Sequence, residues 1–591
     1  MFGFFDKFYK PRRDQLLAAG RGGTRAQNHS DPIGVCASAA TCPRGDATCQ
    51  LDPAQYPCLQ GRPIQLEPQQ LRCVMHMLEN NELLADHVVG AGKTYIAVAT
   101  AACLLDRDPN MHCWMITPAG LRQNMLDTLL AYGVHDMTRI HIMGHDEFYR
   151  ALMGTSKAHA KLTPDVLRNA FVAIDEVHGF RNPDGKRTRQ LLKAMQYAAK
   201  ILLMTGTSAY NFPSDTCVSL AMLYRTTKVF HLDRFNETVD AALYRGDWKS
   251  ARLIQELFRC MISMHHVNNP AMFPEALDEV VTLVMPDTFF AKYAVIEEAE
   301  EAKMRARYGS IDPTVFYNGL RQAVNDAELD ADATSPKIPW IVDCLQRHAD
   351  EQAVVYSAFL GKGTVQLAAQ LKTKHVPFGQ IYGGMSDKER KATITLYNTR
   401  KNRVMLLSKA GGEGLNLLRT EIMIGMEPGW QEAGTSQFKG RGSRRGSHKN
   451  MPAHRRRVRR FDLVLDKPHE RRKLADYMKA DFNAYEDEHR ELLVEQGWAT
   501  PSVDHYMFRL SKRKNERNKR FMLMVQPGSI EKLNCHSGVA VCVPRAASAS
   551  AGASSAAAAA PAAAAASSVA AHAPPSSKKN GRGNRRNSLN Q

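Results

Sequence analysis

Short runs of consecutive apolar residues recur between residues 61 and 225, and each run ends in a polar or glycine-rich turn. The runs lie at residues 113–116, 171–174 and 201–204. Strands of this length without alternation, separated by helical patterns, are typical of a parallel sheet buried on both faces. Polar residues follow each run directly, at the edge where ligands bind in open α/β sheets. The pattern predicts an α/β lobe over 61–225.

A second set of such runs predicts another α/β lobe over 336–465. These runs lie at residues 353–356, 404–407 and 421–424. Between the two lobes, residues 226–335 carry long helix-favouring stretches such as 289–308, and this region is predicted to be a helical insertion. The expected fold class is therefore α/β, with two parallel-sheet lobes.

The two ends of the chain have different compositions. Residues 1–60 are rich in Gly, Arg, Asp and Pro without a sustained period, which predicts a disordered leader. Residues 466–545 begin as a charged, helix-prone segment and are predicted to form a helical C-terminal extension. The Ala/Ser/Pro tract and final basic residues of 546–591 are typical of a low-complexity basic tail. A length of 591 residues agrees with two to four domains.

The positive charge of the chain indicates a candidate binding partner. The net charge is +18, and residues 439–473 hold 14 Lys or Arg against 3 Asp or Glu. Such clustering favours a polyanion, since bound phosphates release counterions, although a solvated basic face is the alternative. No stretch reaches the roughly 18 apolar residues that span a bilayer, so no membrane partner is expected. The twelve cysteines lack paired zinc-ligand spacing, and an intracellular, reducing location is expected.

An ATP site is predicted from two motifs about 80 residues apart. Gly90 and Gly92 precede Lys93 and Thr94, so backbone N–H groups can point at phosphate oxygens while Lys93 binds the β- and γ-phosphates. Thr94 would hold Mg²⁺ together with the first carboxylate of a later Asp-Glu pair at 175–176. The first glycine of the usual eight-residue pattern is replaced by His87. The sequence therefore predicts ATP and Mg²⁺ as cofactors.

Further short sequence motifs lie before, between and after these two, and they occur in the same order as in a known family of proteins. Between residues 62 and 450 the sequence resembles the superfamily 2 helicases and, within them, the Swi/Snf-type DNA-dependent ATPases. Arg181 and Asn182 after the Asp-Glu-Val-His block are typical of the Swi/Snf type, whereas Ser208 and Gln431 depart from its pattern. The blocks are at 66–70, 84–94, 116–121, 175–183, 204–211, 355–359, 381–390, 408–417 and 437–444.

The resemblance implies two RecA-like lobes and a role for each matched residue. Catalysis would use Lys93, Asp175, Glu176, Arg441 and Arg444, with Glu176 activating water and the arginines completing the site when the lobes close. Gln70 would recognise adenine, and Gly412 would also contact ATP. Hydrolysis would be coupled to lobe movement by His178, Thr205, Thr207 and Gln437, with a plain packing role for His178 as the alternative. Nucleic acid would contact Thr117, Ser357, Ser408 and Lys409.

The predicted function is a nucleic-acid-dependent ATPase that couples hydrolysis to translocation on DNA, in viral transcription or genome handling. Its relatives are expected among the transcription-associated ATPases of large DNA viruses, from short matches at 445–448 and 529–531. RNA polymerase or other transcription proteins are then candidate partners, in the virion and the host cytoplasm or nucleus. Two alternatives stay open: a helicase that separates DNA or RNA strands, and a promoter-binding or assembly factor whose lobes clamp DNA.

Overall fold

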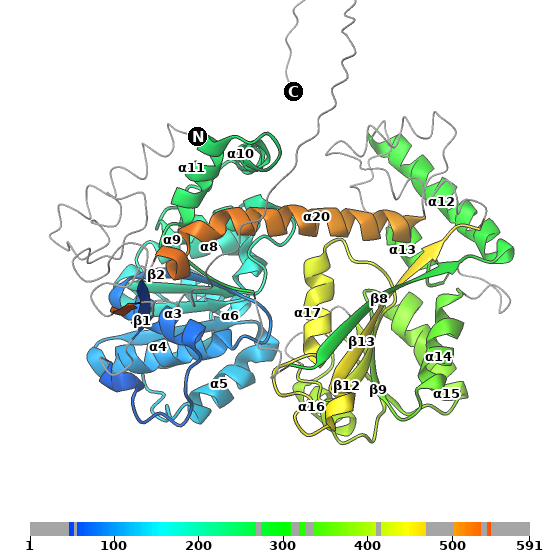
Figure 1. Cartoon of the computed structure of the whole chain (residues 1–591), viewed down its shortest axis with the longest axis horizontal. Coiled ribbons are helices and arrows are strands. Elements are labelled where there is room, and N and C mark those ends of the chain that lie inside the picture. The colour runs from blue at the N-terminus through cyan, green and yellow to red at the C-terminus, as the bar shows by residue number, and fades with distance from the viewer. Residues whose placement is uncertain are drawn as a thin grey trace, which may run out of the picture. The chain divides into compact units, whose positions relative to one another are not determined.

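The computed structural model describes residues 47–51, 56–266, 273–308, 318–326, 335–408, 415–468, 502–533 and 540–544. Two six-stranded sheets dominate it, and every strand pair within them is parallel (Figure 1). The α/β fold class with two parallel-sheet lobes is thereby confirmed.

The sheet of lobe 1 has the order β4-β3-β5-β6-β2-β7. Its strands are β2 (Glu82–His87), β3 (His112–Thr117), β4 (Ile140–Gly144), β5 (Ala170–Asp175), β6 (Lys200–Thr205) and β7 (Ile262–His265). Trp114 and Ile116 of β3 pack into one hydrophobic cluster, whereas Cys113 and Met115 pack into another. Successive side chains of a strand point to opposite faces, so these apolar runs bury both faces of the sheet.

Helices of lobe 1 cover both of those faces. The helices α3 and α4 pack together in the cluster that holds Cys113, and α8 and α9 belong to the cluster that holds Trp114. The bounds are α3 (Pro68–Glu79), α4 (Lys93–Arg107), α5 (Arg122–Ala131), α6 (His145–Met153), α7 (Pro164–Arg168), α8 (Lys186–Met195), α9 (Thr216–Leu223), α10 (Leu232–Tyr244) and α11 (Trp248–Phe258).

The sheet of lobe 2 has the order β10-β11-β9-β12-β13-β8. Its strands are β8 (Glu275–Val284), β9 (Gln352–Ser357), β10 (Phe378–Ile381), β11 (Val404–Ser408), β12 (Thr420–Gly425) and β13 (Arg457–Asp466). The remaining helices are α12 (Asp287–Tyr308), α13 (Asn318–Ala323), α14 (Lys337–Arg347), α15 (Gln366–Thr373), α16 (Asp387–Asn398), α17 (Glu432–Gly442), α20 (Val503–Val525) and α21 (Ile530–Leu533).

The prediction of a purely helical insertion over 226–335 is wrong in one respect. This region contains β7 and β8, which form the edge strands of the two sheets. Strand β8 pairs with β13 along its whole length, from Glu275 opposite Arg457 to Val284 opposite Asp466. Residues 275–279 of β8 have little intrinsic strand preference, whereas the Val and Thr residues of 280–284 favour a strand, so pairing with β13 decides the conformation of the first half.

Parts of the predicted leader and C-terminal extension also carry structure. Strand β1 (Ala47–Leu51) pairs antiparallel with β14 (Ala540–Pro544). A disulfide joins Cys58 to Cys103 of α4, which the spacing of the cysteines did not predict. The rest of the leader before residue 56 and the basic tail from 545 lie outside the described residues. Among the described helices, none is long and apolar enough to cross a membrane.

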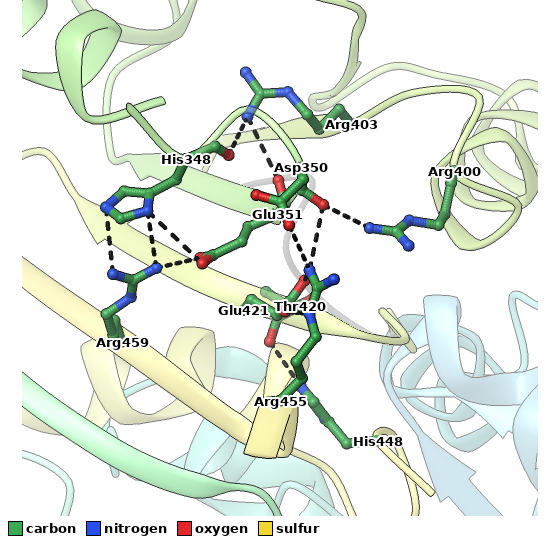
Figure 2. Close-up of polar contacts among 10 residues, drawn as sticks. All are labelled: His348, Asp350, Glu351, Arg400, Arg403, Thr420, Glu421, His448, Arg455 and Arg459. Atoms are coloured by element: carbon green, nitrogen blue, oxygen red, sulfur yellow. Dashed lines mark hydrogen bonds and ion pairs between the residues drawn. The ribbon is translucent and has the colours of Figure 1, made fainter. Parts of the chain in front are cut away.

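Much of the basic run at 439–473 makes ion pairs or hydrogen bonds within lobe 2. Arg455 donates to both carboxylate oxygens of Glu421 at 2.6 and 2.9 Å, and Arg459 contacts His348 and Glu351 at the amino ends of the strands (Figure 2). Lys439 pairs with Asp462 at 2.8 Å. Part of the charge that suggested a polyanion therefore stabilises the sheet edge instead.

Helix α20 packs on both lobes (Figure 1). Val503 and Met507 near its start belong to a cluster with residues of α12 and β13, whereas Phe521 and Val525 near its end belong to the core of lobe 1. Its first turn holds Asp504, which accepts a hydrogen bond from the backbone N–H of Leu465 at 3.0 Å.

The buried ion pair between Lys337 of α14 and Asp504 is expected to anchor α20. Their Nζ–Oδ2 distance is 2.6 Å, and the side chains are 0% and 3% exposed. Lys337→Ala would leave the carboxylate buried and unpaired, so the free energy of unfolding should fall by about 3–5 kcal/mol. Denaturant unfolding followed by circular dichroism measures this.

Arg347→Ala is the matched control, since Arg347 and Asp343 form an exposed pair on the same helix. Loss of this exposed pair should lower the free energy of unfolding by about 0.3–0.5 kcal/mol. Equal losses in the two variants would contradict the anchoring role of the buried pair.

Candidate active site

The phosphate loop connects β2 to α4 in lobe 1. Gly90 and Gly92 have φ values of +89° and +77°, in the left-handed region that favours glycine, and Gly92 caps the N-terminus of α4. Lys93 follows at the first turn, and its Nζ donates to the His87 carbonyl oxygen at 2.8 Å. The loop therefore presents a helix N-terminus and a lysine together, an arrangement suited to binding phosphate.

The amide of Gln70 joins the start of α3 to this loop. Its Oε1 accepts from the N–H of Glu67 at 2.9 Å, which completes a capping box at the start of α3. Its Nε2 donates to the carbonyl oxygens of Ala91 and Gly92 at 2.9 and 3.3 Å, and the side chain is buried. In this arrangement Gln70 holds the phosphate loop, and both ends of the amide that was predicted to recognise adenine already have partners within the protein.

Asp175 and Glu176 lie at the carboxyl end of β5. Asp175 is buried, its Oδ1 accepts from the N–H of Glu176 at 3.0 Å, and burial together with its neighbour's charge raises its pKa. Glu176 has a φ of 51°, an uncommon conformation that turns the chain just after the strand. Burial acts to raise the Glu176 pKa, but His178, Lys93 and Arg441 outweigh it and lower that pKa. Glu176 is therefore ionised.

His178 connects Glu176 to the end of β6. Its Nδ1 lies 3.0 Å from Thr205 Oγ1 and 3.3 Å from Glu176 Oε2. Thr205 Oγ1 in turn accepts from the N–H of Thr207 at 3.1 Å. The ring of Tyr210 stacks on His178 with centroids 5.0 Å apart and an interplanar angle of 9°. Sequence reasoning did not assign Tyr210 a role, because no motif marks an aromatic residue as a stacking partner.

Two arginines of lobe 2 approach the same carboxylate. Arg441 near the end of α17 lowers the pKa of Glu176, and Glu176 acts to raise the pKa of Arg444, although burial and Arg441 lower that pKa to about 10. The approach is close because Gly440 faces Val89 of the phosphate loop: a Cβ there would lie 2.8 Å from a Val89 methyl. The structure therefore brings together Lys93, Asp175, Glu176, His178 and both arginines.

Three of the four residues predicted to contact nucleic acid have buried side chains. Thr117, Ser357 and Ser408 are 0%, 0% and 4% exposed, respectively. Ser357 donates to the carboxylate of Glu427 at 3.0 Å and accepts from the N–H of Phe359 at 3.1 Å. Lys409, Gly412 and the side chain of Gln437 lie outside the described residues.

Comparison with known families agrees with this arrangement. Residues 67–215 match the DEAD/DEAH box helicase family, and residues 336–446 match the helicase conserved C-terminal domain. The chain belongs to the superfamily 2 helicases. As a superfamily 2 helicase it is an ATP-hydrolysing enzyme that binds nucleic acid.

Its relatives include viral proteins. A "Putative ATP-dependent RNA helicase L538" of Acanthamoeba polyphaga mimivirus is 25% identical over 79% of this chain and 98% of its own length. A "Termination factor NPH-I homolog" of African swine fever virus is 31% identical, over 19% of this chain and 17% of its own length. A solved Sulfolobus solfataricus SWI2/SNF2 ATPase core in complex with dsDNA is 15% identical, covering 78% of this chain and 98% of its own, with a TM-score of 0.31.

Gly92→Ala is expected to weaken ATP binding about tenfold or more. A Cβ there would lie 2.2 Å from Gln70 Nε2, and the φ of +77° is strained for alanine, so either the helicase's phosphate loop or Gln70 must move. Equilibrium titration with a fluorescent ATP analogue measures the change.

Gly246→Ala serves as the control for backbone strain. Gly246 has a φ of +66°, and a Cβ at this position would meet no described atom within 4 Å. The residue is also far from the phosphate loop in the sequence. The variant should bind the analogue like the unaltered protein, and a similar loss in both variants would argue against a specific fit at Gly92.

Proposed function

We propose that this helicase-superfamily enzyme is a nucleic-acid-stimulated ATPase that translocates on duplex DNA and serves viral transcription. The observation that carries the proposal is that Gly440 of lobe 2 lies against Val89 of the phosphate loop, where Arg441 and Arg444 interact electrostatically with Glu176 of lobe 1. Charge from both lobes meets at one carboxylate, so ATP hydrolysis would depend on how closely the lobes approach each other.

The residues at the phosphate loop fit a nucleoside triphosphate with Mg²⁺. Gly90, Gly92 and the N-terminus of α4 offer backbone N–H groups, and Lys93 Nζ, now bonded to a loop carbonyl, can turn to the β- and γ-phosphates. Thr94 and Asp175 would hold Mg²⁺, which would neutralise charge on the phosphates when bound. The donor set of one hydroxyl and one carboxylate is typical for a magnesium ion that keeps several waters.

Water activation is assigned to Glu176. It is ionised, and His178 holds it in place while Thr205 holds His178. Arg441 and Arg444 would stabilise charge that develops on the transferred phosphoryl group, a contribution worth roughly 10³–10⁵ in rate in related systems. Arg444 Nε is buried with no hydrogen-bond partner among the described residues, which supports a donor kept for a ligand.

Duplex DNA is the nucleic acid along which the enzyme is proposed to move, and transcription is the process in which it is proposed to act. The net charge of +18 supports a phosphate-rich partner. The African swine fever virus relative is named as a termination factor, which supports a role beside RNA polymerase in a DNA virus. RNA unwinding is the second candidate, because the mimivirus relative that aligns over 98% of its length is named an RNA helicase.

Duplex DNA is expected to stimulate ATP turnover more strongly than single-stranded DNA or RNA. Lys93→Ala should abolish turnover, and Arg444→Ala should lower kcat about 10³-fold because the transition state loses a cation. Steady-state phosphate release with each nucleic acid provides the comparison. Arg520→Ala is the control, since Arg520 pairs with Glu516 on the exposed side of α20 and should leave turnover unchanged. Preferential stimulation by RNA would replace the DNA proposal with the RNA helicase.

Translocation without strand separation is expected on a duplex that carries a third, triplex-forming strand. The protein with ATP should displace the third strand, whereas a forked duplex should stay paired. Glu176→Gln should retain DNA binding and lose displacement, because binding does not need water activation. Release of labelled strands, followed on gels, distinguishes translocation from unwinding, because an unwound fork supports a helicase. A separate transcription assay tests the DNA clamp, which full activity of Glu176→Gln would support.

A further inference from the structure

A buried hydrogen-bond network reaches the phosphate loop from the C-terminal segment. It centres on Ser263 of β7, whose Oγ lies 2.8 Å from His87 Nε2, 3.1 Å from Cys73 Sγ and 2.5 Å from Glu531 Oε1. Ser263, His87 and Cys73 are each fully buried. These four residues are called the His87 network. They come from β2, α3, β7 and α21, so the tertiary fold alone brings them together.

Glu531 sets the direction of the hydrogen bonds in the His87 network. A carboxylate only accepts, so its Oε2 accepts from the N–H of Met264 at 3.1 Å and its Oε1 accepts the hydroxyl proton of Ser263. The lone pairs of Ser263 Oγ are then left to accept from His87 Nε2–H and Cys73 Sγ–H. Burial, together with the charge of Lys93, lowers the pKa of His87 to about 3, so the ring is neutral.

His87 links the His87 network to the phosphate loop. It is the last residue of β2 and stands where the usual loop pattern has glycine, so the loop begins with a side chain fixed in the core. Its carbonyl oxygen accepts from Lys93 Nζ at 2.8 Å, and the next residue's N–H donates to the His265 carbonyl at 2.8 Å. A shift of His87 would therefore displace an acceptor of the phosphate-binding lysine.

We propose that Glu531 is a positioning residue for nucleotide binding: through Ser263 it fixes His87 and, with it, the start of the phosphate loop and Lys93. The inference rests on the proposed function in placing ATP at this loop. Glu531 follows α20, whose first turn is anchored in lobe 2 by Lys337. The nucleotide affinity of lobe 1 thus depends on a segment that also contacts lobe 2.

Glu531→Gln tests this with almost no change in volume. The amide has one oxygen and one NH₂ group in place of two carboxylate oxygens, so it cannot accept at both the Ser263 and the Met264 positions. One buried donor must then lose its partner, or His87 must change tautomer. His87 Nδ1 has no hydrogen-bond partner among the described residues, so the second tautomer would bury an unpaired donor. The expected result is about tenfold weaker binding of a fluorescent ATP analogue with Mg²⁺, while kcat at saturating ATP stays within about twofold.

Two further variants keep the result interpretable. Ser263→Ala removes the same link from inside lobe 1 and should weaken binding to a similar extent, and the double variant should be no weaker than either single one. Gln255→Ala is the matched control, because Gln255 Nε2 donates to the Met524 carbonyl at 3.0 Å and so ties the C-terminal segment to lobe 1 without reaching the loop. It should lower the melting temperature and leave the affinity unchanged.

The binding assay contains no nucleic acid, so it is independent of translocation. Unchanged affinity in folded Glu531→Gln and Ser263→Ala proteins would overturn the inference, as would an equal loss in Gln255→Ala, which would indicate general loosening. Lys93→Ala distinguishes a failure of the proposed function from a failure of the positioning role alone. If it binds the analogue normally, the nucleotide site itself is misplaced and the proposed function fails. If it loses binding while the Glu531 and Ser263 variants do not, the positioning role alone fails.

Discussion

Two adjacent carboxylates, Asp175 and Glu176, are packed together at the carboxyl end of β5, and compensation of their charge organises the surrounding site. Burial acts to raise the pKa of each carboxyl group. Lys93 of the phosphate loop and Arg441 of lobe 2 supply the opposing positive charge. Because unpaired buried charge is costly, the two lobes stabilise each other electrostatically at the place where phosphoryl transfer is proposed. Hydrolysis and lobe approach then depend on the same charges.

The close approach of the lobes has steric requirements as well. Gly440 lets α17 lie against Val89 of the phosphate loop, where any Cβ would be too near. Helix α20 adds a second connection, since its two ends pack into the cores of different lobes. The segment after it then inserts Glu531 beneath the loop. Movement of lobe 2 can therefore reach the nucleotide site both through the arginines and through the C-terminal segment.

The positive charge of lobe 2 serves two purposes. Arg455 and Arg459 hold the amino ends of the strands by pairing with Glu421 and Glu351 (Figure 2). Arg441 and Arg444 interact electrostatically with Glu176 instead. A local excess of basic residues in a sequence thus combines structural ion pairs with functional cations, and composition alone does not separate them.

The sequence by itself determined the two parallel-sheet lobes, and it predicted the residues of the proposed ATP site. Apolar runs that are buried on both faces and motifs that follow a strand directly are local features, so Lys93, Asp175 and Glu176 could be placed from spacing. The strand β8 was missed because its first half, residues 275–279, has little strand preference, and pairing with β13 extends the strand through it. Ser357 was expected at nucleic acid, but Glu427, 70 residues away, captures its hydroxyl. The His87 network joins residues up to 268 positions from Ser263, and hydrogen bonds over such separations exist only once the chain has folded. Tertiary structure therefore decided which side chains surround the proposed ATP site and which other side chains hold them in place.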